Sequence, residues 1–347
     1  MSSDTSQSAA LRVLVGLAAF VVVIAGARAA QSIIVPFLLA GFLAIISAPY
    51  LNWLQRRGVP QVVALVLVIA AILATGFVLA ALVGTSVDDF TETLPYYQER
   101  LQTEVAGFVA WLHGKGVDVS DRTFLNYVDP ASAMRLASAL LRGLGNVLTN
   151  AFLIVLTVIF ILMEASSFPG KLRAALGTPE HPLEQSRTVL DNIKRYMTIK
   201  MMTSALTGIV VALGLAAMGV DFPLLWGFFA FLLNFIPNVG SFIAALPAIL
   251  IAQLELGLFW ALMTTMLYLA VNIIVGSILE PRWMGDRLGV SPLIVFLSLV
   301  FWGWVFGPVG MFLSVPLTIS IQIALASHED SRWVAILLGP NPESGRK

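Results

Sequence analysis

The chain has no cysteine, only three histidines and few charged residues, which make up 12% of its 347 residues. The absence of cysteine excludes disulfides, thiolate nucleophiles and cysteine metal sites. The histidines, His113, His181 and His328, form no cluster in the sequence. Soluble domains carry roughly 25% charged residues. A chain with 58% hydrophobic residues and so little charge therefore lacks the polar surface that a globular core needs.

Sequence motifs of enzymes are also missing. The chain has no H-E-x-x-H, no G-x-S-x-G and no Walker A pattern. The formal net charge is zero, which gives no indication of nucleic-acid binding. We therefore expect no catalytic residue, no cofactor and no metal site. Without a nucleotide-binding motif, we also expect no ATP-driven transport by this chain alone.

What is present is a series of long, nearly uncharged runs. A membrane-spanning helix needs about 20 apolar residues, and only helices satisfy their own backbone hydrogen bonds within a single run. The sequence predicts an all-α polytopic membrane protein with about six full transmembrane helices and two re-entrant or short-armed hairpins. The full spans are residues 11–27, 32–51, 62–84, 147–163, 201–218 and 258–278, and the hairpin arms are 222–235, 242–254, 293–304 and 309–325.

This pattern divides the chain into four regions. They are a three-helix segment at 1–84, an extracytoplasmic segment at 85–145, a transport region at 146–326 and a tail at 327–347. The transport region includes a basic cytoplasmic helix at about 165–200. We expect both termini to be cytoplasmic, because Lys and Arg then concentrate in the loops that face the cytoplasm. Segment 85–145, which then lies outside, carries eight acidic residues. We expect the Lys and Arg side chains of helix 182–200 to meet anionic headgroups.

The first hairpin turns at the sequence NFIPNVGSF, residues 234–242. Pro237 lacks an N–H group, and Gly240 tolerates a positive φ, so the two residues predict a turn within apolar sequence. Such backbone is tolerated at membrane depth only beside protein or a water-filled cavity. Asn234 and Asn238 then either line a path for a polar solute or cap the two arms, and the two roles are compatible.

The second hairpin, residues 291–318, breaks at Gly303, Gly307, Pro308 and Gly310. With the topology above, the two hairpins enter from opposite faces and are separated by one full span. Broken helix pairs of this kind are typical of secondary transporters with inverted repeats, whose substrate site lies between the broken tips.

Few ionisable residues lie within or beside the apolar runs. Asp221 and Glu255 stand at the two ends of the first hairpin and could face each other at its outer mouth. Glu280 and Arg282 flank Pro281, where a local ion pair could fix the turn. These four residues are candidates for ion coupling or gating, or else interfacial residues that reach water.

Residues 86–112 have apolar side chains at helical spacing, including Phe90, Tyr97 and Leu101. This amphipathic helix either covers the protein's own outer face or lies on the membrane or a neighbouring subunit. A partner-binding role for it would fit a membrane scaffold that transports nothing.

Two stretches resemble the autoinducer-2 exporter family of bacterial permeases. They read LNFIPNVGSFIAALPAIL at 233–250 and NIIVGSILEPRWMGDRLGVSPLIVFLSLVFWGWVFGPVGMFLSVPLT at 272–318. Residues 36–60 are similar to the family's N-terminal helix pair. The matching motif residues are Asn234, Pro237, Asn238, Gly240, Glu280, Pro281, Gly307, Pro308 and Gly310.

The resemblance implies a multi-pass transporter of the bacterial inner membrane that works as a homo-oligomer, such as a pentamer. It also implies export of autoinducer-2 or a related small polar solute, by secondary transport or by a passive path. Sodium(lithium)/proton exchange is the alternative that the family also implies. The substrate pathway would then include Asn234, Pro237, Asn238, Gly240, Gly307, Pro308 and Gly310.

Overall fold

The structure is a computed structural model that describes residues 3–115, 150–164, 171, 180–237, 239–284, 291–326 and 332–339. The described residues are helical or lie in turns between helices, and no strand occurs among them. Six of the described helices are long and apolar enough to cross a membrane. The prediction of an all-α polytopic membrane protein is thus confirmed.

The six long helical segments are not the six full spans that the sequence predicts. Segment 239–256, an arm of the first hairpin, and segment 293–312, which runs across the break of the second hairpin at Gly307, are long enough to count. The apolar part of the first helix, residues 14–29, and the helix at residues 151–164 are shorter. The segments are Gln31–Arg56, Gln61–Trp111, Ile193–Met218, Val239–Leu256, Leu258–Trp283 and Leu293–Phe312.

The chain divides into two compact units. The first comprises Met1–Ile45, Asn150–Thr178 and Val290–Lys347, and the second comprises Ile46–Thr149 and Pro179–Gly289. Each unit therefore contains one of the two interrupted hairpins.

Within the described residues, the first unit contains five helices and the beginning of α2. Trp302, Val305 and Phe306 form its buried core, against which side chains of the two N-terminal helices pack. Helix α15 joins the start of α13, since the Ser291 N–H donates to the Leu338 carbonyl oxygen at 3.3 Å. The helices are α1 (Ser3–Ala29), α2 (Gln31–Arg56), α6 (Ala151–Glu164), α13 (Pro292–Phe312), α14 (Ser314–Ala326) and α15 (Arg332–Leu338).

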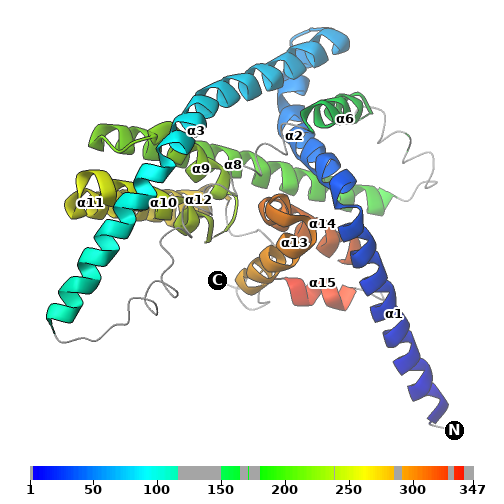
Figure 1. Ribbon diagram of the computed structural model, residues 1–347. Helices are drawn as coiled ribbons and strands as arrows, with labels where there is room; N and C mark the ends of the chain where they lie inside the picture. The colour runs from blue at the N-terminus through cyan, green and yellow to red at the C-terminus, as the bar shows by residue number, and fades with distance from the viewer. Residues whose placement is uncertain are drawn as a thin grey trace. The chain divides into compact units, whose positions relative to one another are not determined.

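The second unit is built around the first hairpin, with α8, α9, α10 and α11 packed side by side (Figure 1). Its helices are α3 (Gln61–Gly114), α8 (Glu180–Met218), α9 (Pro223–Leu233), α10 (Val239–Leu256), α11 (Leu258–Val271), the π-helix η1 (Asn272–Leu279) and α12 (Glu280–Met284).

Helix α3 differs from the prediction, because it runs without interruption through the expected boundary between residues 84 and 85. The predicted outer amphipathic helix is its continuation. Phe90 and Tyr97 are buried, and the Phe90 ring lies edge-on against Phe222 and Trp226 at the start of α9. The apolar face of this part of α3 thus covers the chain's own hairpin, as one of the two interpretations expected. The rest of the predicted outer segment, residues 116–145, lies outside the described residues.

Helix α8 joins the predicted basic helix to the predicted fifth span in one element. Its first described residue is Glu180, so most of residues 165–179 lie outside the described part of the chain.

The arms of the first hairpin are unequal. Helix α9 has 11 residues and α10 has 18, which corresponds to about 17 and 27 Å at 1.5 Å per residue. The sequence predicted equal arms because it placed Val239, Gly240 and Ser241 in the turn. In the structure these three residues form the first turn of α10.

Candidate functional site

The turn of the first hairpin depends on a close approach of two backbones. A Cβ atom on Gly240 would overlap the carbonyl oxygen of Leu233 at the end of α9. Gly240 is not among the glycines with positive φ. The predicted reason for this glycine, left-handed backbone, is therefore wrong, and the actual reason is space. Pro237 lies in the turn as predicted, and Asn238 lies outside the described residues.

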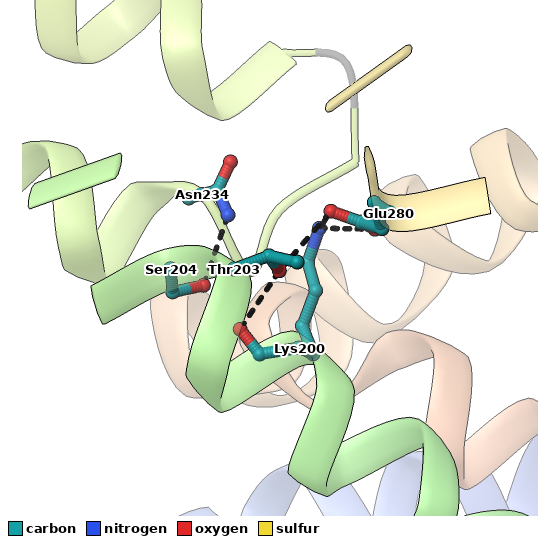
Figure 2. A network of polar contacts seen from close by, with 5 residues as sticks. All are labelled: Lys200, Thr203, Ser204, Asn234 and Glu280. Carbon is teal, nitrogen blue, oxygen red and sulfur yellow. Dashed lines mark hydrogen bonds and ion pairs between the residues drawn. The ribbon is translucent and has the colours of Figure 1, made fainter. Parts of the chain in front are cut away.

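Asn234 is the C-cap residue of α9, and its side chain also reaches the neighbouring helix α8. The Asn234 Nδ2 group donates a hydrogen bond to Ser204 Oγ at 3.0 Å (Figure 2). Ser204 itself is completely buried. The cap position and the polar contact thus occur together, and Asn234 connects the hairpin turn to a polar face of α8.

That face of α8 carries a line of buried polar side chains within apolar sequence. Lys200, Thr203, Ser204 and Thr207 follow one another along the helix, and all four are buried. Residues three or four positions apart lie on one side of an α-helix. A polar line of this kind inside a membrane helix needs partners from neighbouring elements, because unpaired polar groups are costly in an apolar environment.

A second polar line comes from the segment that runs from α11 through η1 to α12. Thr264, Tyr268, Asn272 and Glu280 occupy positions separated by four or eight residues. The segment changes from α to π geometry at Asn272 and returns to α geometry at Glu280. π-Helical segments are rare and are often found at functional sites.

A small cavity lies where these elements meet at the hairpin turn. It is lined by Thr207, Ala230, Asn234, Ser241, Tyr268, Val271 and Asn272. It is large enough for about one water molecule. Its polar lining side chains carry amide and hydroxyl groups and no formal charge.

Two buried hydroxyl groups of α11 have no hydrogen-bond partner within the described residues. They belong to Tyr268, which lines the cavity, and to Thr264, one turn away on the same helix. A buried hydroxyl without a partner is unfavourable by about 1–3 kcal/mol. The Tyr268 hydroxyl is thus available to a water molecule or a polar solute in the cavity.

The two polar lines meet again at an ion pair. Lys200 Nζ donates to both carboxylate oxygens of Glu280, at 2.7 and 2.9 Å (Figure 2). Thr203 Oγ1 lies 3.3 Å from Glu280 Oε2 and 3.2 Å from the Lys200 carbonyl oxygen. The side chains of Lys200 and Glu280 are only 5% and 16% exposed, so the pair is shielded from water.

This ion pair corrects two expectations. Glu280 pairs with Lys200 of α8 and not with Arg282, whose residue is exposed. Lys200, expected to meet lipid headgroups with the other basic residues of its helix, is buried inside the protein. We refer to Lys200, Thr203, Ser204, Thr207, Asn234, Tyr268, Asn272 and Glu280 together as the polar seam.

Asp221 and Glu255 come together at the opposite end of the hairpin arms from its turn. The hydroxyl group of Tyr97, on α3, lies 3.1 Å from Asp221 Oδ2 and 2.7 Å from Glu255 Oε1. The expected proximity of the two carboxyl groups is thus present, and Tyr97 is the residue that joins them. One phenolic hydrogen cannot donate fully to both carboxylates, so the Tyr97 hydroxyl is shared between them.

The second hairpin breaks where the sequence predicts. Gly307 has φ 66° and ψ −150°, and Pro308 directly follows it. A Cβ atom on Gly310 would overlap the carbonyl oxygen of Trp302, which is the same kind of contact that Gly240 makes with Leu233. Trp302 Nε1 donates to Thr318 Oγ1 at 3.0 Å and so connects α13 to α14.

The polar seam contains residues that the sequence patterns did not single out, namely Lys200, Thr203, Ser204, Thr207 and Tyr268. The sequence does carry a signal for them. The α8 residues recur at helical spacing in an apolar run, and Tyr268 lies four positions before Asn272. That signal could have suggested two polar helix faces, although not that the faces meet. The predicted roles of the site residues stay predictions.

The apolar helices, the interrupted hairpins and the buried polar seam are typical of one class of protein, the multi-pass helical membrane transporters. Residues 17–329 match the model of the family described as "AI-2E family transporter". The chain belongs to this family. The family resemblance in the sequence is thereby confirmed.

Three relatives illustrate the similarity. The chain is 40% identical over 328 residues to "AI-2 transport protein TqsA" of Escherichia coli strain K12, and the match covers 94% of this chain and 95% of that protein. It is 37% identical over 346 residues to "Putative transport protein YhhT" of the same organism, covering 100% and 99%. It is 38% identical over 334 residues to a "Putative transport protein" of Haemophilus influenzae, covering 94% and 96%.

Proposed function

We propose that this protein exports a small polar signalling molecule, such as autoinducer-2, across the bacterial inner membrane. It does so as a secondary transporter or as a facilitator. The observation that carries the proposal is the uncharged cavity at the hairpin turn, with the unpartnered Tyr268 hydroxyl in its lining among the described residues. The name of the E. coli relative TqsA supports autoinducer-2 as the first solute to test.

Amide and hydroxyl groups suit a neutral solute that carries hydroxyl groups, because they donate and accept hydrogen bonds without adding net charge. The cavity is water-sized in this structure, so a furanosyl molecule requires it to widen. Two of its borders are irregular elements, the hairpin turn after Leu233 and the π-helix η1. These elements can move with less loss of regular hydrogen bonding than a continuous α-helix.

The arrangement in the cell is part of the same proposal. We propose that both termini are cytoplasmic and that the hairpins enter the bilayer from opposite faces. Assembly into a homo-oligomer, such as a pentamer, is a prediction that rests on the resemblance to the family. The chain is expected to bind lipid and a small solute, and no nucleic acid.

Uptake of labelled autoinducer-2 into everted membrane vesicles tests the function. Uptake above that of vesicles without the protein, abolished by an uncoupler, means energised export. Uptake that only equilibrates the solute, with or without the uncoupler, means a facilitative path. Uptake equal to that of the control vesicles, with the protein present at normal levels, contradicts autoinducer-2 as the solute.

Sodium(lithium)/proton exchange is the second candidate, and the carboxyl pair of Asp221 and Glu255 is the observation that favours it. Exchange requires a carboxyl group that loses and regains a proton in each cycle. Single neutral variants of Asp221, Glu255 and Glu280 should then include at least one without exchange. Unchanged sodium-dependent proton flux in all three variants would remove this candidate.

A scaffold without transport is less well supported. The apolar face of α3 at Phe90 and Tyr97 is already covered by the hairpin of the same chain, so this part of the face is not free for a partner. Deletion of residues 86–112 should remove a partner from a scaffold, whereas an exporter that still assembles should retain flux.

A further inference from the structure

The Lys200–Glu280 ion pair lies between the cavity and the exposed residues that follow Glu280. Lys200 precedes the cavity-lining Thr207 by seven residues, and Glu280 follows the cavity-lining Asn272 by eight. The pair therefore lies about 10 Å from the cavity along both helices. Directly beyond Glu280, the residues Pro281, Arg282 and Trp283 are exposed.

The polar seam is continuous between the pair and the cavity. Thr203 and Ser204 occupy the intervening turns of α8, Thr203 contacts Glu280, and Ser204 accepts a hydrogen bond from Asn234 of the cavity lining (Figure 2). A solute or a water molecule that moves along the seam from this end would find hydrogen-bonding groups at each turn. The first obstacle for this solute or water molecule would be the Lys200–Glu280 ion pair.

We propose that Lys200 and Glu280 form a gate, which closes one end of the polar seam while they are paired and opens that end when they separate. The inference rests on the proposed transport function, because it assigns the seam as the path. It places Glu280, a gating candidate from the sequence, at one end of that path, and it adds Lys200, which the sequence did not indicate.

The π-helix gives the gate a route for movement. Glu280 is the first residue after η1, and Asn272, the first residue of η1, lines the cavity. A π-helix has one more residue in each hydrogen-bonded ring than an α-helix, so a change between the two forms shifts the register of the next helical turn. Separation of Glu280 from Lys200 and rearrangement of the cavity wall are therefore coupled through the eight residues of η1.

The test uses the fact that the chain has no cysteine. A single cysteine at Thr207 reports the accessibility of the cavity to a small, charged, membrane-impermeant thiol reagent, applied separately to each side of the membrane. A second reporter, Ala248→Cys, lies at a fully buried position of α10 outside the seam. Labelling rates are measured with the full chain in membrane vesicles.

With the native pair, labelling of the Thr207→Cys reporter should be slow. Adding Glu280→Gln should increase its rate by about tenfold or more, from one side only, since an unpaired buried lysine no longer holds the helices together. A double variant in which the two charges are swapped, Lys200→Glu with Glu280→Lys, should restore slow labelling of the Thr207→Cys reporter. The Ala248→Cys reporter should stay slow throughout.

A matched control is the ion pair between Lys171 and Glu164, which has the same 2.7 Å distance but exposed side chains. Glu164→Gln should leave labelling of the Thr207→Cys reporter unchanged, because water already solvates that pair. If Glu280→Gln inserts poorly, the double variant Lys200→Gln and Glu280→Gln leaves no unpaired buried charge and answers the same question.

Two results would overturn the gate. One is an unchanged labelling rate of the Thr207→Cys reporter when the pair is removed. The other is an equal increase at the Ala248→Cys reporter, which would mean general loosening. Labelling needs no transported solute, so a failure of autoinducer-2 uptake and a failure of the gate are separate results.

Discussion

In the first hairpin Gly240 lies against the carbonyl oxygen of Leu233, and in the second hairpin Gly310 lies against the carbonyl oxygen of Trp302. The two turns thus use the same steric solution. Their side chains differ. The first turn carries Asn234 and borders the cavity, whereas the residues before the second break include the buried apolar side chains of Trp302, Val305 and Phe306. The comparison indicates that close backbone approach is common to the two hairpins, whereas the first turn is the one that places polar side chains beside the described cavity.

The largest expected effect comes from removing the shared contact. Gly240→Ala and Gly310→Ala would each place a methyl group on a backbone carbonyl, which cannot rotate away as a side chain can. We expect each to lower the free energy of unfolding by roughly 3 kcal/mol or more. Thermal unfolding of the purified protein in detergent measures this loss.

Gly76→Ala is the control for this prediction, because no atom lies near the position that its Cβ would take. Ala is also a better helix former than Gly. Its melting temperature should equal or slightly exceed that of the wild type. Equal melting temperatures for Gly240→Ala and Gly76→Ala would show that the hairpin turn is not tightly packed.

The next effect distinguishes the two breaks. Gly307→Ala puts a side chain on backbone that is essentially restricted to glycine, at a cost of about 1–3 kcal/mol. Pro237→Ala should cost less, because none of the described turn residues 234–237 has a positive φ. The difference between the two melting temperatures tests this order, and a larger loss for Pro237→Ala would contradict it.

A smaller effect on stability but a distinct effect on transport is expected from the polar residues. Asn234→Ala and Asn238→Ala should lower solute flux, by about tenfold if each loses one good hydrogen bond to the solute in the transition state. Their membrane levels should stay normal. Thr318→Ala removes the partner of Trp302 in the second hairpin and should lower stability by about 1 kcal/mol with normal flux.

Vesicle uptake normalised to the amount of protein measures the flux of the asparagine variants and of Thr318→Ala, and thermal unfolding measures the stability of Thr318→Ala. Wild-type flux in the double Asn234 and Asn238 variant would remove these amides from the path. A loss of flux in Thr318→Ala equal to that in Asn234→Ala would mean that polar side chains of the second hairpin matter for flux as much as those of the first.

An equally small effect on stability is expected at the far end of the first hairpin. Tyr97→Phe removes the hydroxyl that joins Asp221 to Glu255 while keeping the buried ring, and should lower stability by about 1 kcal/mol. Tyr96→Phe is the matched control, because its side chain is exposed and its hydroxyl accepts a hydrogen bond from Arg100 at the protein surface. Chemical denaturation compares the two variants, and equal midpoints would mean that the carboxyl pair does not depend on Tyr97.

Several parts of the site were predictable because their causes are local. Gly307 and Pro308 together disfavour a continuous helix, so the second break could be placed within residues 303–310. Asp221 and Glu255 stand at the ends of two arms joined by a turn, so their proximity results from the antiparallel path of the chain. The Lys200–Glu280 pair had no such local cause, because its residues are separated by the whole first hairpin and by α11.

The sequence by itself determined the class of the protein, the series of apolar runs and the approximate positions of both hairpin breaks, because hydrophobicity, proline and glycine act on the chain where they stand. The tertiary structure alone decided that Gly240 provides space and not left-handed backbone, that α3 continues past residue 84 to cover the hairpin, and that Lys200 turns inward to Glu280. These features depend on which helix faces meet. That choice is made by packing and by the need of each buried polar group for a partner on another element.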